Sequence, residues 1–339
     1  MEGIRQYSVE AWFAAEIAGA QLPLRFERIP GGHSNLTFRV VDAAGRQYVL
    51  RRPPLGSVLE SAHDVARECR ILAALLPTDV PVPPVRALCT DPGVNGAPFY
   101  VMDFVVGSVL HDSSAGRSVP EAARRALGFE LIDVLARIHA VSLDATGLVS
   151  LGRREDYIAR QLRRWSRQYE AARVRDLPAL TRAGALLQSA IPFQKEATLV
   201  HGDYRLGNCI VAGEPRIAAV LDWELCTLGE PLADLGYLLN TWLAPAEIDP
   251  ALGDLSPSAA GGFPSREELT AHYAAATGRD VSHIDYYRAF SYWRSAAINE
   301  GVYARYLNGA MGASTVDLAR YEAGGRRYAE QALALVERL

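Results

Sequence analysis

The sequence has few cysteines and almost no lysine. Its four cysteines, Cys69, Cys89, Cys209 and Cys226, lie far apart and include no CxxC pair. This spacing argues against a zinc knuckle, a redox dithiol or a disulfide framework. Lys195 is the single lysine, so arginine supplies nearly all of the positive charge. The formal net charge of −4 argues against a broad nucleic-acid-binding surface, and we expect no nucleic-acid partner.

Long apolar runs are also missing. No stretch of about 18 uncharged apolar residues occurs, so we expect no membrane-spanning helix and no membrane partner. The first residues lack the basic start and apolar run of a targeting segment, which favours a cytoplasmic protein. With 339 residues, 49% of them apolar, the chain is long enough to form two lobes.

The first third of the chain predicts a small lobe of mixed helix and sheet. Alternation of apolar and polar residues predicts strands, and a period near 3.6 residues predicts helices. The expected elements are a helix over 7–20, strands over 24–29, 36–41 and 47–51, a helix over 61–76, and strands over 85–88 and 99–105. We place the end of this lobe at residue 106.

Residues 107–339 predict a larger, mainly helical lobe. Helical patterns cover 121–141, 156–173, 177–191 and 232–243, and three more lie within 265–339. A hairpin is expected from strands near 209–211 and 217–221. The segment 245–264 is rich in Pro and Gly and predicts a loop or a mobile insertion. The expected fold class is therefore α+β, with two lobes.

The most specific motif is His201-Gly202-Asp203 with Asn208 five residues after the aspartate. Asp222 follows the second strand of the predicted hairpin. This spacing is the one that kinases use for a catalytic base and two magnesium ligands. We expect Asp203 to accept the proton of a substrate hydroxyl, and Asn208 and Asp222 to offer oxygen ligands to Mg²⁺. A single aspartate would more simply cap a turn, and His201 is interpreted as a support for the loop.

These residues resemble the aminoglycoside phosphotransferase and choline kinase family, a branch of the protein-kinase-like superfamily. Leu221-Asp222-Trp223-Glu224 stands where protein kinases carry Asp-Phe-Gly. Residues 227–236, 290–298 and 301–305 are similar to a subgroup related to the kinase-like domain fused to acyl-CoA dehydrogenases in animals. The resemblance covers roughly residues 20–310 and implies a two-lobed, protein-kinase-like fold.

The resemblance implies ATP and Mg²⁺ as cofactors and assigns nucleotide contacts to the small lobe. The third strand carries Arg51 where the family has a lysine, and Glu68 on the following helix is its expected ion-pair partner. Each assignment has a simpler alternative: residues 31–35 could form a plain hairpin turn, Glu68 could be a solvated helix residue, and residues 99–107 could be a buried edge strand and linker. The expected nucleotide-binding residues are Gly31, Gly32, His33, Ser34 and Asn35 in a glycine loop, Arg51 and Glu68, and Met102, Asp103, Phe104 and Val105 in the hinge between lobes.

The helix that includes residues 293–305 is the expected wall of the acceptor site. Aromatic residues at helical spacing, as on this helix, more often belong to a core than to a ligand-binding wall. Arg294 and Arg305 suit an anionic acceptor, and the C-terminal helices lack the dense acidic patch that a polycationic aminoglycoside would need. The candidate acceptor-binding residues are Trp293, Arg294, Asn299, Glu300 and Tyr303.

The sequence thus predicts a phosphotransferase with an alcohol group as acceptor. The preferred function is transfer of the ATP γ-phosphate to a hydroxyl of a small acceptor, a hydroxy acid or a hydroxyacyl-CoA. Two alternatives stay open: an aminoglycoside O-phosphotransferase, and a catalytically weak nucleotide-binding pseudokinase, because the usual third-strand lysine is missing. The sequence does not decide between ATP and GTP, and it does not give the oligomeric state.

Overall fold

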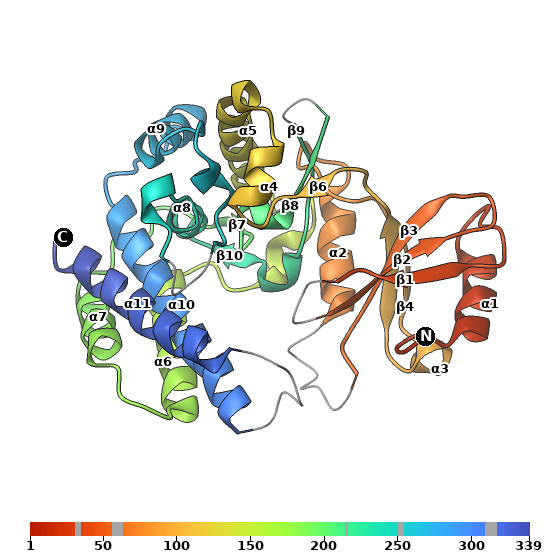
Figure 1. Ribbon diagram of the computed structural model, residues 1–339, viewed down its shortest axis with the longest axis horizontal. Coiled ribbons are helices and arrows are strands. Elements are labelled where there is room, and N and C mark those ends of the chain that lie inside the picture. The colour runs from red at the N-terminus through yellow and green to blue at the C-terminus, as the bar shows by residue number, and fades with distance from the viewer. Residues whose placement is uncertain (31–34, 56–63, 214–215, 250–253, 309–316) are drawn as a thin grey trace.

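The computed structural model describes residues 1–30, 35–55, 64–213, 216–249, 254–308 and 317–339. A sheet-rich lobe with the N-terminus stands at one end of the molecule, and a larger helical lobe with the C-terminus stands at the other (Figure 1). The predicted α+β, two-lobed fold class is confirmed. Among the described residues, no helix is long and apolar enough to cross a membrane.

The small lobe is built on a five-stranded antiparallel sheet. Its strand order is β1-β2-β3-β5-β4, so the first three strands form the expected meander and β5 pairs with β3. The bounds are β1 Arg25–Arg28, β2 Leu36–Val41, β3 Gln47–Arg52, β4 Val85–Cys89 and β5 Phe99–Asp103, with helices α1 Gln6–Glu16, α2 Val65–Leu75 and α3 Pro92–Asn95.

Alternation along the strands divides the sheet between two apolar clusters. Leu50 packs with Phe13 of α1 on one face, while Val49 belongs with α2 on the other. On the α2 face, Tyr100 and Met102 of β5 are part of a continuous apolar cluster that runs into the large lobe. The sheet is therefore fixed both to its own covering helix and to the core of the larger lobe.

The large lobe consists of helices around two short ribbons of strands. One ribbon pairs β7 Thr198–Val200 with β10 Thr227–Gly229, and the other has the order β6-β8-β9, from Ser108–Val109, Cys209–Ala212 and Arg216–Val220. The long helix α10 packs against α6, α7, α8 and α11. The helices are α4 Ser113–Ser118, α5 Glu121–His139, α6 Tyr157–Ala172, α7 Pro178–Ser189, α8 Leu232–Asn240, α9 Arg266–Thr277, α10 Ile284–Leu307 and α11 Leu318–Val336.

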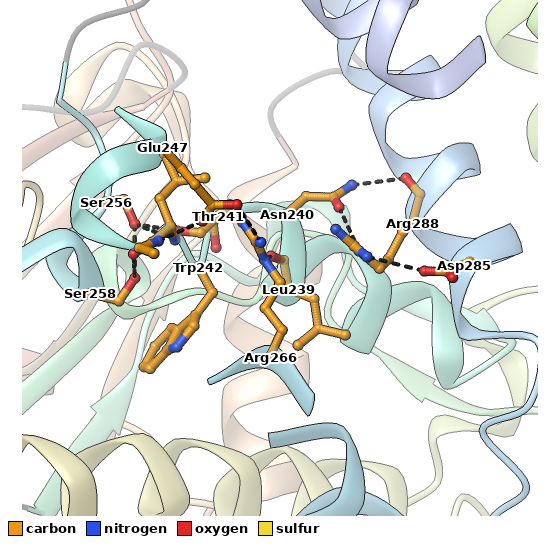
Figure 2. A network of polar contacts seen from close by, with 12 residues as sticks. Leu239, Asn240, Thr241, Trp242, Glu247, Ser256, Ser258, Arg266, Asp285 and Arg288 are labelled. Carbon is orange, nitrogen blue, oxygen red and sulfur yellow. Dashed lines mark hydrogen bonds and ion pairs between the residues drawn. The ribbon is translucent and has the colours of Figure 1, made fainter. Parts of the chain in front are cut away.

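The described parts of the Pro/Gly-rich segment 245–264 form a loop, as predicted, and hydrogen bonds hold them in place. The Ser256 hydroxyl donates to the Thr241 carbonyl over 2.7 Å, and the Ser258 hydroxyl donates to the Leu243 carbonyl over 2.9 Å. The Trp242 indole donates to the Pro264 carbonyl over 2.8 Å. Figure 2 shows these serines and Trp242 gathered beside the end of α8. The serines thus satisfy backbone carbonyl groups that follow the end of α8.

Residues 254–260 of this segment also pack closely on α4. Short 3₁₀ turns cover Pro245–Glu247 and Pro257–Ala260. Asp254 accepts from the Ser113 backbone N–H at 3.0 Å, at the start of α4. Gly116 of α4 lies so close to the second turn that an added Cβ would stand 2.1 Å from the Pro257 carbonyl oxygen. A glycine is therefore required there by backbone-to-backbone approach.

We expect Gly116→Ala to lower the free energy of unfolding by about 1–3 kcal/mol, because the new methyl group must force two backbones apart. Gly301→Ala on α10 is the matched control: a Cβ there meets nothing within 4 Å. It should leave stability unchanged or raise it by up to about 1 kcal/mol through helix propensity. Urea unfolding of both variants measures the difference, and equal stabilities would contradict close packing of 245–264 on α4.

Candidate active site

The catalytic-motif loop leaves β7 at the junction of the two lobes. Gly202 has φ +87°, in the left-handed region, and an added Cβ would stand 2.9 Å from the Leu225 carbonyl oxygen. The chain then passes Asp203, makes a short 3₁₀ turn over Leu206–Asn208 and enters β8. This sharp turn brings Asp203 and Asn208 back together.

Asn208 is bonded directly to the predicted base. Its Nδ2 donates to the Asp203 carbonyl over 2.8 Å and to Asp203 Oδ2 over 2.7 Å. Both amide hydrogens are thereby used, which leaves the Asn208 Oδ1 atom as the acceptor for a cation. The side chain orients the carboxylate and is itself fixed by it.

Asp222 is held next to this pair by backbone contacts. The Leu221 N–H donates to the Asn208 carbonyl over 2.8 Å, so the residue before Asp222 is tied to the catalytic loop. Asp222 itself has φ +65°, which is uncommon for a residue other than glycine. His201 adds a further tie, since its Nε2 lies 2.9 Å from the Leu221 carbonyl and its Nδ1 accepts from the Asp203 N–H at 3.2 Å. His201 is fully buried and supports the loop, as interpreted from the sequence.

Asp234, at the start of α8, braces the whole loop. Its carboxylate accepts from two consecutive backbone N–H groups, His201 at 2.6 Å and Gly202 at 2.8 Å. His139 Nε2 lies 3.4 Å away on the other side. Burial alone would raise the pKa of the Asp234 carboxyl, but the hydrogen bonds from His139 and Gly202 outweigh it and hold this pKa below its usual value.

Arg51 links the small lobe to this loop. Its Nη2 lies 2.5 Å from Asp222 Oδ1, its Nε lies 2.9 Å from Glu68 Oε2 on α2, and Glu224 Oε2 is 3.9 Å away. Burial would lower the pKa of Arg51, yet the charges of Glu68 and Asp222 overcome this and raise it. The guanidinium therefore stays charged. It joins the predicted phosphate-binding strand to a predicted metal ligand.

Arg67 is a second connection that the sequence did not single out. From α2, its Nη2 donates to the Cys226 carbonyl over 2.5 Å, and its Nη1 to the Glu224 carbonyl over 3.4 Å. Asn35, the described end of the predicted glycine loop, donates to Glu224 Oε2 over 3.5 Å. Gly31, Gly32, His33 and Ser34 lie outside the described residues.

The predicted hinge lies where β5 ends. Met102 is buried, and the Asp103 carboxylate pairs with Arg86 over 2.5 Å. The Asp103 N–H donates to the Pro84 carbonyl and the Phe104 N–H to the Gln47 carbonyl. Among the backbone N–H groups of Asp103, Phe104 and Val105, that of Val105 is therefore the one left to meet a nucleotide base.

The five candidate acceptor residues do not share one surface. Trp293 is 3% exposed and donates its indole N–H to the Leu180 carbonyl over 3.1 Å. Glu300 is 2% exposed and receives two bonds from Arg175, at 2.9 and 2.6 Å. The Arg175 guanidinium also lies 4.9 Å from the centre of the Tyr303 ring. The polar groups of Trp293 and Glu300 are thus already hydrogen-bonded to other residues of the protein, as expected if these side chains belong to the core and not to an acceptor site.

Arg294 and Asn299 differ from these three. Arg294 Nη2 donates to the Gly202 carbonyl over 2.6 Å, which places this buried cation beside the catalytic loop. Its guanidinium lies 5.4 Å from the centre of the Tyr237 ring. Among the described residues, Arg294 Nε and Asn299 Oδ1 are buried atoms without a hydrogen-bond partner. Together with Ser291 Oγ, these are buried polar atoms on α10 that the described residues leave unpaired.

Tyr237 and Arg205 also surround Asp203, and sequence reasoning passed over both. The Tyr237 phenol hydrogen-bonds Asp203, and burial together with that carboxylate raises the pKa of Tyr237, so it stays a neutral donor. Tyr237 is three residues after Asp234 on α8, a spacing that puts both on one helix face and was a usable signal. Arg205 stands inside the motif itself, with Nε 3.7 Å from Asp203 Oδ1.

The donor set suits magnesium. In the described part of the chain, no group of three or more His, Cys, Asp or Glu side chains is arranged as a metal cage. Mg²⁺ does not need one, because it commonly takes one or two protein oxygens and completes its shell with waters and phosphates. The Asn208 Oδ1, which accepts no hydrogen bond from the described residues, and the Asp222 carboxylate, which is 29% exposed, fit that pattern.

A two-lobed fold with this Asp-Asn-Asp set at the lobe junction defines a small-molecule phosphotransferase with a protein-kinase-like architecture. Residues 25–272 match the model of the phosphotransferase enzyme family, and the chain belongs to this family. The resemblance drawn from the motifs is thereby confirmed.

The relatives agree with this placement. The chain is 40% identical over 296 residues to acyl-CoA dehydrogenase family member 10 of Mus musculus, covering 86% of this chain and 28% of the relative. It is 37% identical over 335 residues to family member 11 of Gallus gallus, covering 96% of this chain and 42% of the relative. The chain thus spans less than half the length of these relatives.

Solved structures show the same fold. A candidate aminoglycoside phosphotransferase from Ralstonia eutropha superposes with a TM-score of 0.83 at 34% identity, covering 98% of each chain. A choline kinase from Cryptosporidium parvum gives a TM-score of 0.68 at 12% identity, covering 97% of this chain and 96% of that one. The second likeness concerns the fold alone.

We expect Asp234→Asn to destabilise the protein by about 1–3 kcal/mol, because one of two buried backbone N–H groups would face an amide NH₂. The pKa of Asp234 is lowered in the folded state, so its contribution is present above the unfolded pKa of about 3.9 and is lost as pH falls through the folded value. Urea unfolding at pH 7 and near pH 3 should show a difference that shrinks in acid. A difference independent of pH would contradict this role.

Proposed function

We propose that this protein transfers the γ-phosphate of ATP to a hydroxyl group of a small acceptor. The observation that carries the proposal is an unbroken set of contacts from base to phosphate-binding arginine. Asn208 bonds Asp203, Leu221 bonds Asn208, and the adjacent Asp222 pairs with Arg51. A turn-capping aspartate would need none of this, so the set supports a constellation for phosphoryl transfer.

Each residue has a role in the proposal. Asp203 orients the acceptor hydroxyl and takes its proton. Asn208 and Asp222 hold Mg²⁺, which neutralises phosphate charge when bound. Arg51, oriented by Glu68, binds the α- and β-phosphates in place of a lysine, a change that suits the bidentate guanidinium. Asn35 and Val105 are the described residues best placed to meet phosphate and base.

The preferred acceptor is a hydroxy acid or a hydroxyacyl-CoA. Arg294 lies buried beside the Gly202 carbonyl and has a second nitrogen without a partner among the described residues, which favours an anionic ligand near the loop. The named relatives are acyl-CoA dehydrogenase family members. That name belongs to proteins of which this chain spans less than half, so it supports the acyl-CoA preference indirectly.

Two other functions have a specific observation in their favour. The similar Ralstonia eutropha structure carries an aminoglycoside phosphotransferase description, which favours an aminoglycoside acceptor. The absence of a lysine on β3 favours a nucleotide-binding pseudokinase. Against the pseudokinase stands the retention of Asp203 and Asn208 in direct contact, with Asp222 tied to Asn208 through the Leu221 N–H.

We expect Asp203→Ala to abolish phosphate transfer while nucleotide binding is largely kept, since Asp203 contacts Asn208 and the acceptor side rather than Arg51. Transfer from ATP is measured over a panel of hydroxyacyl-CoAs, hydroxy acids, amino alcohols and aminoglycosides. A preference for the anionic members supports the proposed acceptor class, and one for aminoglycosides overturns it. Near-normal turnover by the variant would show that Asp203 is not the base.

We expect Mg-ATP to raise the melting temperature of the wild-type protein and Asp222→Asn to lose the magnesium-dependent part of that shift, because a carboxylate ligand is replaced by an amide. ATP hydrolysis should fall in parallel. Asp176→Asn, at an exposed carboxylate between α6 and α7 that pairs with Arg173, is the matched control. A wild-type protein that neither shifts with magnesium nor hydrolyses ATP would favour the pseudokinase.

A further inference from the structure

The Asp203 carboxylate has a cation on the side away from Asn208. Asn208 Nδ2 bonds Oδ2 at 2.7 Å, whereas Arg205 Nε stands 3.7 Å from Oδ1. A distance of 3.7 Å is an ion pair without a hydrogen bond, so it holds the guanidinium only loosely. The Arg205 side chain is 28% exposed and can therefore reach a ligand.

The other arginines around the loop are already engaged. Arg51 pairs with Glu68 and Asp222, and Arg67 donates to the Cys226 carbonyl. Arg294 donates to the Gly202 carbonyl and is only 7% exposed. Within the described ranges of the chain, Arg205 has no anionic partner closer than Asp203. Apart from the buried Nε of Arg294, the five N–H donors of Arg205 are thus the cationic donors near Asp203 that the described residues leave uncommitted.

Gly207 explains why this side chain lies over the loop. An added Cβ at Gly207 would stand 2.2 Å from Arg205 Nη1 and 2.8 Å from its Cζ. The guanidinium is therefore folded across bare backbone between Asp203 and Asn208. Gly207 has no left-handed φ, so its backbone conformation does not require glycine. A side chain at this position would therefore displace the Arg205 guanidinium from the loop.

The reaction places the transferring phosphoryl group within reach of this arginine. An acceptor hydroxyl hydrogen-bonded to Asp203 lies about 2.7 Å from the carboxylate, and the attacked phosphorus lies about 3–3.5 Å beyond the hydroxyl oxygen. The equatorial phosphoryl oxygens then come within a few ångströms of Asp203. A guanidinium next to Asp203 meets them.

We propose that Arg205 is a catalytic residue that donates hydrogen bonds to the equatorial oxygens of the phosphoryl group in transfer. The acceptor oxygen forms a bond to phosphorus, the bond to the β–γ bridging oxygen breaks, and the hydroxyl proton passes to Asp203. Negative charge on the phosphoryl oxygens is met by Arg205 in the transition state. This inference deepens the proposed function and rests on it.

The test does not require knowledge of the acceptor. Water can replace the acceptor, so slow ATP hydrolysis is measured by release of labelled phosphate. Arg205→Ala should lower the rate about 10²–10³-fold, the effect of losing one donor to a developing oxyanion, while the Kd for Mg-ADP stays within a few-fold. Arg205→Lys should fall between, and Arg182→Ala, an exposed arginine on α7, should match the wild type.

A binding measurement complements the rate. Mg-ADP with aluminium fluoride mimics the planar phosphoryl group, and it should stabilise the wild-type protein against heat more than Mg-ADP alone. Arg205→Ala should lose this additional shift and keep the Mg-ADP shift. Gly207→Ala, which displaces the guanidinium but keeps its charge, should lose part of both effects. Free guanidinium should partly restore hydrolysis by Arg205→Ala, which a purely structural role would not allow.

The outcomes separate this inference from the proposed function. If Arg205→Ala hydrolyses ATP at the wild-type rate and keeps the aluminium fluoride shift, Arg205 is not catalytic. An unchanged hydrolysis rate with a raised KM for the acceptor would instead make it an acceptor-binding residue and also overturn the inference. If the wild-type protein shows neither hydrolysis nor any nucleotide shift, the proposed function itself fails.

Discussion

The buried carboxylate of Asp234 is the contact on which the site depends. It accepts from the N–H groups of His201 and Gly202, where the chain leaves β7 and turns sharply. A loop that turns this tightly cannot satisfy its own backbone groups, so a side chain from α8 does so. Gly202 can then adopt its left-handed φ, and its carbonyl is met by Arg294 from α10. Asp203, the proposed base, is thus positioned by the core of the large lobe.

A second constraint joins the lobes. Arg51 reaches from the sheet to Asp222, while Glu68 holds it from α2. A buried guanidinium is costly unless carboxylates surround it, and these carboxylates would in turn be costly without it. The sheet, α2 and the catalytic hairpin therefore form one electrostatic unit. Arg67 strengthens it by bonding carbonyls that follow Asp222.

Several predictions from the sequence agree with the structure because they rest on local physics. Alternation of apolar and polar residues located β2 and β3. It also distinguishes Arg51 from Arg52, because successive side chains of a strand point to opposite faces. Arg51 therefore meets Glu68, while Arg52 donates to the Gly3 and Asn95 carbonyls.

The predictions about ligand-binding residues on α10 agree less well with the structure. Trp293 and Glu300 looked like ligands by residue type, but a buried Trp or Glu serves packing when a protein partner satisfies it, and the partners Leu180 and Arg175 are over 100 residues away in the chain.

The sequence by itself determined the lobes, most elements and the Asp203, Asn208 and Asp222 set, since periodicity and motif spacing are encoded within short segments. Only the tertiary structure decided which groups surround that set. Arg67, Tyr237 and Arg294 come to the loop from three helices, and Ser256 and Ser258 are fixed by carbonyls that follow the end of α8. Such partners are chosen by packing between distant segments, and no local pattern records which buried polar group will meet which.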